Sequence, residues 1–405
     1  MNMLSRRKAL LAGAALGAAP LGAGTLPAAT AAASTNHEPG ASPRHGDRVP
    51  EETRTLDELY QAAKAEGGKL VVYAGGDIPA QQAGTVAAFQ QSFPDVALTM
   101  VVDYSKFHDV RVDNQFATGT LVPDVIHLQT LQDFPRWKAE VRLLAYKPAG
   151  FSKVYDHFKD PDGTWVAINV VAFSFMYDTR TIGGTPPRTP RDLVDPRWTG
   201  KIASSYPNDD DAVLYLYSLY AQTYGWDWIA ELAQQQLRFA RGTNTPREAV
   251  SAGVVPIGLA ASGTLVPSAS PVKWLVADGH PFMSWSQRAA IFKDAAHPAA
   301  AKLYLNWQLS SARQQTSSNG WSVRTDVSMP GGLRPIWTYP NAHVDGFPQF
   351  MADRAGAERW RQTFSLYFGE VVGAPSSGWL GLHPGRYSAR TQWNPRPEGR
   401  GDRLD

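Results

Sequence analysis

From Lys69 onward the sequence alternates between short apolar runs and amphipathic helical patterns, and this alternation restricts the possible folds more than any other feature. The run KLVVYAGGD is typical of a buried strand that ends in glycines, and the next residues place Gln82, Val86, Phe89 and Phe93 on one helical face. Further strands are predicted within 95–104 and 123–129, and further helices within 107–117 and 131–139. Strands that alternate with helices predict a mainly parallel sheet covered by helices on both faces.

The same alternation returns after a loop rich in proline and glycine at 181–200. The segments GKIASSYPN and VVPIGLAAS each predict a strand. Between them the pattern predicts helices at 211–224 and 226–236, and residues 245–252 lead into the second strand. A chain of 405 residues exceeds what one hydrophobic core usually serves, so we expect two α/β domains. The long run TWVAINVVAFSFMYDTR is then expected to pass from one domain into the other.

Polar residues follow the predicted strands, at the edge where open α/β sheets bind ligands. The candidate ligand-binding residues are Gly76, Asp77 and Gln129 in the first unit, and Ser204, Tyr206, Asn208, Asp209 and Ser262 in the second. The acidic run at 209–211 has an alternative role, since carboxylates also cap and stabilise the first turn of a helix. Trp165 is a further candidate, either as an aromatic cover for a ligand or as a core residue at the domain junction.

The N-terminal region has the features of an export signal. Arg6 and Arg7 precede an apolar run, Ala9–Ala19, that is too short to span a membrane, and small Ala-rich residues follow it. This pattern predicts a twin-arginine signal peptide over 1–33. Residues 34–53 are rich in Pro, Gly, Ser and charge and predict a disordered lead-in.

Folded structure is expected to start at Thr55, because Glu58 follows three residues later in a capping-box pattern. At the other end of the chain we expect an extension over 328–392 that packs on the two domains through a C-terminal helix. A charged tail rich in Pro and Gly over 393–405 is expected to be disordered.

Composition and motifs exclude several functional classes. The chain has no cysteine, which excludes disulfides, thiolate metal sites and cysteine nucleophiles. The formal net charge is only +2 and no basic cluster is interleaved with aromatics, so nucleic acid is not an expected partner. No G-x-S-x-G, H-E-x-x-H or Walker A motif is present, and His297 before Pro298 is interpreted as a helix start. We therefore expect no catalysis and no cofactor.

Several segments, in consistent order, resemble one known family. They are DPDGTW, MYDTR, DLVDPRWTGKI, EAVSAGVVPIGLA and HPAAAKLYLNWQLSSARQQ with VRTDV after it, and together they cover roughly Leu70 to Val327. They look like the extracellular solute-binding proteins of the ferric-iron-binding branch of ABC importers. The resemblance implies a type II periplasmic-binding-protein fold: one α/β lobe from 54–168 and 280–327, a second from 169–279, and a ligand cleft between them.

The residues do not support the iron site that this resemblance implies. The family typically supplies a histidine after the first strand, a glutamate after the third and a tyrosine pair after the strand of the EAV…G unit. Here Asp77 and Gln129 stand at the first two positions, and GLAASGTLV holds no tyrosine. We therefore expect a small polar organic solute, with ferric iron or another metal as the alternative ligand.

The resulting hypothesis is a monomeric exported protein, periplasmic or extracellular, that captures the solute and delivers it to an ABC permease. Two alternatives remain open. One is a secreted enzyme on the same two-lobed scaffold, since a fold does not dictate a function. The other is a binding protein that serves a sensor instead of a transporter.

Overall fold

The structure is a computed structural model that describes residues 49–316, 319–373 and 379–386. The predicted signal peptide over 1–33, most of the lead-in over 34–53 and the tail over 393–405 lie outside the described residues. Within these residues no helix combines the length and apolar character needed to cross a membrane.

One mixed sheet organises the described residues. Its strand order is β2-β1-β3-β9-β4-β7-β5-β6, and β8 pairs with β4. Strands β1, β2 and β3 are parallel, as are β5, β6 and β7, whereas the pairs that involve β4 and β9 are antiparallel. The strands are β1 Lys69–Gly75, β2 Ala97–Asp103, β3 Val125–Leu128, β4 Val166–Asp178, β5 Ile202–Ser205, β6 Arg238–Ala240, β7 Ile257–Ser262, β8 Val272–Leu275 and β9 Met283–Ile291.

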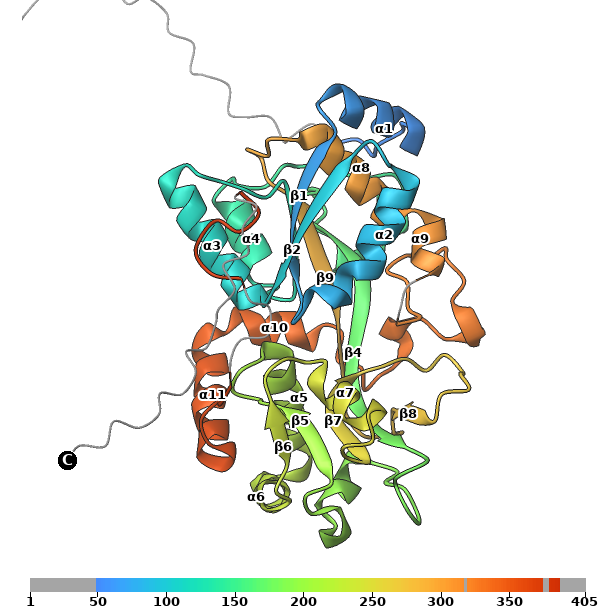
Figure 1. The fold of residues 1–405 in the computed structure, drawn as a ribbon, viewed down its shortest axis with the longest axis vertical. Helices are drawn as coiled ribbons and strands as arrows, with labels where there is room; N and C mark the ends of the chain where they lie inside the picture. Colours follow the sequence, from blue (N-terminus) through green and yellow to red (C-terminus); the bar gives the residue numbers. More distant parts are fainter. Residues whose placement is uncertain (1–48, 317–318, 374–378, 387–405) are drawn as a thin grey trace, which may run out of the picture. The chain divides into compact units, whose positions relative to one another are not determined.

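Helices flank the two parallel parts of the sheet (Figure 1). We call lobe 1 the part built from β1–β3 with helices α1–α4, α8 and α9, and lobe 2 the part built from β5–β7 with α5–α7. The helices are α1 Leu56–Ala65, α2 Ala83–Ser92, α3 Ser105–Thr118, α4 Asp133–Ala139, α5 Asp211–Tyr224, α6 Trp226–Gln234, α7 Thr245–Ser251, α8 Pro298–Leu309, α9 Ser311–Gln315, α10 Gly346–Ala352 and α11 Arg354–Phe368.

Strands β4 and β9 belong to both lobes. The first half of β4 pairs with β9 up to Phe173, and its second half pairs with β7 on one edge and β8 on the other. Strand β9 in turn reaches β3 through its last four residues. Both strands are buried along nearly their whole length, as expected of strands that are covered on two faces.

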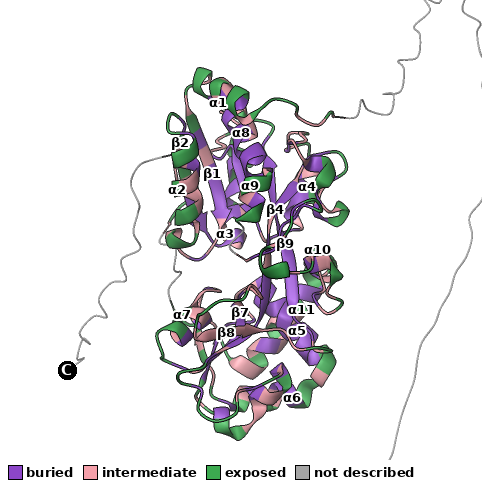
Figure 2. Ribbon diagram, turned by 90° about the vertical axis from the view of Figure 1, so that its right-hand side faces the viewer, coloured by how far each residue is buried: buried purple, intermediate pink, exposed green. Residues whose placement is uncertain are grey.

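Helix α5 differs from the amphipathic helix that its sequence predicts. All residues from Asp211 to Ala221 are buried, and Figure 2 shows α5 packed beside α11. The ring of Tyr217 contacts Phe364 and Phe368 of α11, at 5.8 and 5.6 Å between centroids. The C-terminal helices therefore cover the face of α5 that would otherwise meet solvent.

The starts of two helices follow their sequence signals. Thr55 and Glu58 form the predicted capping box of α1. His297 precedes Pro298 at the start of α8, and its backbone N–H and Nδ1 lie 2.8 and 3.0 Å from the buried carboxylate of Asp124. Ordered chain begins earlier than predicted, because Glu51 accepts hydrogen bonds from the backbone of the 150–152 segment.

Candidate functional site

A cavity of about 390 Å³ lies between lobe 1 and lobe 2. Its walls come from residues at or just after the carboxyl ends of β1, β2 and β3 in lobe 1, and of β6 and β7 in lobe 2. The middle of β4 and β9 completes the lining. The cavity therefore lies where an α/β sheet is expected to place a ligand.

Two glycines let the loop after β1 pass close to its neighbours. A Cβ atom on Gly75 would lie 2.4 Å from the hydroxyl oxygen of Ser105, and one on Gly76 would lie 2.8 Å from Oε1 of Gln81. Gln81 accepts a hydrogen bond from the backbone N–H of Asp77, and its Nε2 donates to the Asp77 carboxylate at 3.1 Å. These contacts fix the Asp77 side chain in the cavity.

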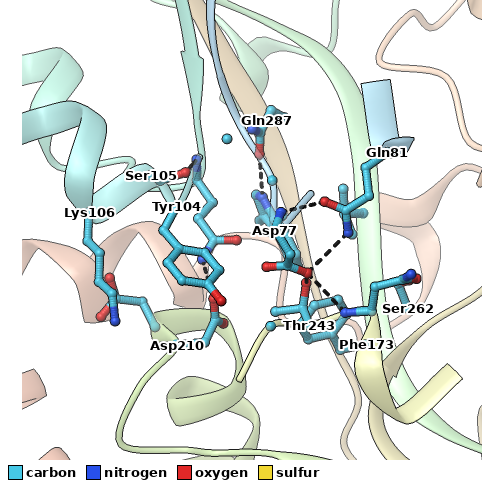
Figure 3. A pocket seen from close by; sticks show the side chains of 18 of the residues that line it. Asp77, Gln81, Tyr104, Ser105, Lys106, Phe173, Asp210, Thr243, Ser262 and Gln287 are labelled. Atoms are coloured by element: carbon cyan, nitrogen blue, oxygen red, sulfur yellow. Dashed lines mark hydrogen bonds between the residues drawn. The ribbon is translucent and has the colours of Figure 1, made fainter. Parts of the chain in front are cut away.

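Asp77 connects lobe 1 to lobe 2 (Figure 3). Its Oδ2 accepts hydrogen bonds from the hydroxyl group of Thr243 at 2.9 Å and from the backbone N–H of Asn244 at 3.0 Å. Gly242 has a φ of 92° and its missing Cβ would lie 3.2 Å from the Asp77 carboxyl carbon, so glycine is needed for this approach. Burial raises the pKa of Asp77, although the three donors oppose that rise.

A second contact between the lobes joins Lys106 to Asp209. The Lys106 ammonium group lies 2.6 Å from Oδ1 of Asp209 and also donates to the Asp209 backbone oxygen. Arg241 binds both carboxylate oxygens of Asp209, at 2.9 and 3.1 Å. Burial acts to raise the pKa of Asp209, but the two cations outweigh it and hold that pKa below its usual range.

A third contact joins Gln129 to Asp210. Gln129 Nε2 donates to Oδ2 of Asp210 at 2.7 Å, while Oδ1 of Asp210 caps α5 by accepting from the N–H groups of Ala212 and Val213. Burial raises the pKa of Asp210 to about 6, and the nearby carboxylates of Asp211 and Asp77 contribute to that rise. The acidic run at 209–211 thus combines capping of α5 with contacts across the cleft.

Strands β4 and β9 add an aromatic and amide surface to the cavity. Phe173 and Trp285 meet edge to face, with ring centroids 5.0 Å apart. Trp285 Nε1 donates to Gln287 Oε1 at 3.0 Å, and Gln287 Nε2 donates to the backbone oxygen of His127 at 3.2 Å. Arg247 of α7 lines the same cavity and donates from Nη2 to the backbone oxygen of Ser262.

The structure divides the candidate residues into two groups. Five of them line the cavity: Gly76, Asp77, Gln129, Asp209 and Ser262. The other four do not. Ser204 is hydrogen-bonded to the Tyr217 hydroxyl group, Tyr206 stacks on Phe239, Asn208 binds Ser365 and Gly369, and Trp165 lies 3.9 Å from the Arg288 guanidinium.

Sequence reasoning missed several cavity residues on lobe 2 and on the crossover strands. Thr243, Asn244 and Arg247 belong to RGTNTPREAV, of which the sequence indicates only that residues 245–252 lead into the next strand. Strand β6, which ends at Ala240, is not predicted from the sequence, and the one local signal is Gly242 shortly after it, because a glycine permits a close backbone approach. For Gln287 no local signal existed, since its place depends on β9 pairing in the middle of the sheet.

The cavity lining offers few of the donors that a hard metal ion prefers. Among the described residues no group of three or more His, Asp or Glu side chains is arranged to hold a metal ion. One tyrosine, Tyr104, lines the cavity, and its ring lies near the cations of Lys106 and Arg241, at 5.6 and 5.7 Å from the ring centroid.

Comparisons with known proteins agree with this arrangement. Residues 109–330 match the profile of a family described as bacterial extracellular solute-binding proteins. Among solved structures, a substrate-binding protein of an ABC transporter from Agrobacterium tumefaciens is 17% identical, with a TM-score of 0.61 over 75% of this chain and 95% of that one. AfuA from Actinobacillus pleuropneumoniae, with fructose-6-phosphate bound, is 18% identical, with a TM-score of 0.60 over 75% of this chain and 99% of that one.

A third similar structure is iron-bound HitA from Pseudomonas aeruginosa. It is 17% identical and has a TM-score of 0.53 over 73% of this chain and 99% of that one. Identities this low establish the fold alone. The fold predicted from the sequence is confirmed: two α/β lobes of the periplasmic-binding-protein type with a cleft between them.

Proposed function

Because this chain belongs to the bacterial extracellular solute-binding proteins, we propose that it captures a small polar organic solute in the cavity between its lobes and delivers it to an ABC importer. The observation that carries the proposal is that lobe 1 and lobe 2 contribute polar groups to one cavity of about 390 Å³. This volume falls in the usual range for small-molecule sites.

Closure of the lobes is the physical basis of capture. Asp77, Lys106 and Gln129 of lobe 1 each bind a partner that follows a strand of lobe 2. A solute that contacts both walls stabilises the closed arrangement, because it makes its full set of contacts only there. The closed form is the state that we propose a membrane permease recognises.

The lining favours a polar organic solute over a metal ion. Amide and hydroxyl groups of Gln129, Gln287 and Ser262 can orient hydroxyl, carbonyl or amine groups, and Phe173 and Trp285 can cover an apolar part. AfuA was solved with fructose-6-phosphate and HitA with iron. Our proposal for this chain rests on the side chains that line its own cavity. They are more typical of a site for a sugar or an organic acid than of a ferric site.

The decisive experiment is to identify what the exported protein carries. The protein is purified under native conditions, then denatured, and the released small molecules are measured by mass spectrometry. A thermal-shift panel and isothermal titration calorimetry follow on the emptied, refolded protein. We expect one polar solute to bind at 1:1 stoichiometry and to remain chemically unchanged. Binding of no solute would overturn the proposal, and conversion of the solute into a product would replace it with an enzyme.

Export and delivery complete the proposal. We propose that residues 1–33 direct the chain through the twin-arginine route, and that the mature protein acts as a monomer outside the cytoplasmic membrane. A permease and an ATPase encoded beside the gene, together with solute uptake that requires this protein, would support delivery to an importer. A neighbouring sensor kinase and unchanged uptake in a deletion strain would instead support a role in sensing.

A further inference from the structure

The carboxylates that line the cavity are already engaged by the protein. Asp77 accepts from Gln81, Thr243 and Asn244, and Asp209 is bound by Lys106 and Arg241. Asp210 caps α5 and accepts from Gln129. Asp211 pairs with Arg361 of α11. The carboxylates of the cavity are therefore engaged before a solute enters, whereas the side-chain oxygen of Asn169, which also lines the cavity, has no hydrogen-bond partner among the described residues.

The cations that line the cavity differ from its carboxylates, because one of them, Arg247, is not paired with an opposite charge among the described residues. Two cations line the cavity, Lys106 and Arg247, and Lys106 is paired with Asp209. Arg247 forms one hydrogen bond, from Nη2 to the backbone oxygen of Ser262. In the part of the chain that the structure describes, no carboxylate lies within ion-pair distance of Arg247. A guanidinium group has five N–H donors, so most of its donor capacity remains open.

The guanidinium group of Arg247 is partly withdrawn from water. Its unused N–H donors therefore carry a desolvation cost when no ligand binds them. Burial lowers the pKa of Arg247, and no carboxylate of the described residues opposes that effect. The group nevertheless stays charged at neutral pH, because arginine does not lose its proton in proteins. Arg247 is partly buried, a charge withdrawn from water is normally paired, and the cavity is the space from which a partner can reach this one.

We propose that the solute carries an oxyanion group, a carboxylate or a phosphate, which Arg247 binds in the cleft. This inference rests on the proposed solute-binding function and narrows it to organic anions. A guanidinium fork suits both oxyanions, since it offers two parallel N–H donors to two oxygens. The rest of the solute lies along Phe173, Trp285 and Gln287.

Arg247 also lines a second cavity, of about 400 Å³, beside the loop that follows β7. Truncation of Arg247 to alanine would therefore change the shape of two cavities together with the charge. Arg247→Gln keeps much of the side-chain length and removes the charge. Arg247→Lys keeps the charge and removes the fork. These two variants separate charge from geometry.

The test uses matched pairs of probes on the emptied protein: glucose 6-phosphate with glucose, glycerol 3-phosphate with glycerol, and gluconate with glucose. Any solute that the purified protein releases is tested as a further probe, paired with a neutral counterpart. We expect an anionic member to bind and its neutral counterpart to bind at least about tenfold more weakly, since one charge-assisted hydrogen bond accounts for a tenfold to hundredfold change. The phosphate and carboxylate pairs show which oxyanion is preferred.

The variants then assign that preference to a residue. Arg247→Gln should lower the affinity for the anion about ten- to hundredfold and leave binding of neutral probes unchanged, with Arg247→Lys between it and the wild type. Melting temperatures of the unliganded proteins serve as the folding control, and Arg247→Lys carries the test should Arg247→Gln fail to fold. Equal anion affinity in the wild type and Arg247→Gln, or a loss seen only in Lys106→Gln, would overturn the assignment.

Two further outcomes are distinguishable. Binding of a neutral solute, with no binding of any anion, would overturn the inference about Arg247 and leave the proposed solute-binding function intact. Binding of no compound, including the released material, would overturn both.

Discussion

The carboxylate of Asp77, at the end of the first strand of lobe 1, accepts a hydrogen bond from the hydroxyl group of Thr243 in lobe 2 at 2.9 Å. The two residues are separated by 166 positions in the chain. Asp77 follows β1 and Thr243 follows β6, and each strand belongs to the parallel part of its lobe. Their contact joins the two lobes at one side of the cleft. Because Asp77 makes this contact and also lines the cavity, we expect it to couple closure of the two lobes to binding of the solute.

Asp77→Ala should therefore weaken binding with little effect on folding. The variant loses the interlobe hydrogen bonds and the carboxylate that faces the cavity. Each buried polar partner left unmatched costs about 1 to 3 kcal/mol, which corresponds to a five- to hundredfold loss of affinity. Calorimetric titration of the solute identified by mass spectrometry measures the change.

Asn208→Ala is the matched control, because Asn208 follows the β5 strand of lobe 2 but lies outside the cavity. Its Nδ2 donates to Ser365 and to the backbone oxygen of Gly369 in the C-terminal extension. We expect a fall in melting temperature, from the loss of about 1 to 2 kcal/mol, and unchanged affinity. An equal loss of affinity in both variants, or none in Asp77→Ala, would remove Asp77 from the site.

Arg111→Met should destabilise lobe 1 through the C-terminal extension. Arg111 is paired with Asp103, which is fully buried, and also donates to the backbone oxygens of Trp379 and Gly381. Loss of the guanidinium leaves the Asp103 charge buried without this partner, a change that costs about 3 to 5 kcal/mol. Urea unfolding followed by circular dichroism measures the difference.

The comparison for Arg111→Met is Lys64→Met. Lys64 pairs with Asp95 at 2.9 Å, but both side chains are exposed to solvent, 39% and 56%. An exposed ion pair contributes little to stability, because water screens its charges, so Lys64→Met should unfold at nearly the urea concentration of the wild type. If the two variants lost the same stability, Arg111 would contribute no more to folding than an exposed surface cation does.

The purified protein should develop no tyrosinate-to-iron charge-transfer colour with ferric citrate. Tyr104 lines the cavity, but the cations of Lys106 and Arg241 lie close to its ring and oppose the approach of a further cation. Absorbance in the visible range, with added ferric citrate and with citrate alone, is the measurement. Stoichiometric red-orange colour that disappears in Tyr104→Phe would contradict the expectation and show that Tyr104 ligates iron.

The sequence predicts much of the fold because its signals are local. Alternation of apolar runs and helical patterns identifies the ends of β1, β2, β3, β5 and β7 but not β6, β8 or β9, and these strand ends identify Asp77, Gln129 and Ser262, which line the cavity. The capping box at Thr55 is another local signal, since its two residues lie within one helical turn.

Other features depend on contacts that no local pattern encodes. Asn208 follows its strand as Asp77 does, yet its amide is bound by the C-terminal extension, more than 150 residues later. The outer face of α5 is apolar because α10 and α11 cover it. Arg247 is found only when the donors and acceptors of the assembled cavity are compared, because its sequence context is an ordinary helix start.

Export should depend on the pair Arg6 and Arg7, which precede the apolar run of the N-terminal region. Changing both to lysine should retain the precursor in the cytoplasm, because twin-arginine export reads the pair as an address and not as a charge. Fractionation and immunoblotting measure the distribution. The double change of Arg44 and Arg48 to lysine, in the lead-in, should leave secretion unchanged. Normal secretion of both double variants would show that the general secretory route suffices.

Stability should depend on pH through Asp210, with a sign opposite to that of a normal surface carboxylate. Burial raises the pKa of Asp210 to about 6 in the folded protein, above the usual value of an aspartate, about 4. The folded state therefore takes up the proton at higher pH than the unfolded state does. The contribution of this group to the free energy of unfolding is largest below about pH 4 and is lost as the pH rises through about 6.

Asp210→Asn isolates this contribution because asparagine also caps helices but does not titrate. The free energy of unfolding of Asp210→Asn minus that of the wild type should be larger at pH 7 than at pH 4. The increase is up to about 3 kcal/mol, because the pKa of Asp210 is shifted by about two pH units. Asp209→Asn should show the reverse, because Arg241 and Lys106 lower the pKa of Asp209, and the stability that this carboxylate contributes is lost as the pH falls. Urea unfolding at a series of pH values compares both variants with the wild type. Parallel pH profiles for Asp210→Asn and the wild type would contradict the expectation, because they would show that Asp210 titrates at the same pH in the folded and unfolded chains.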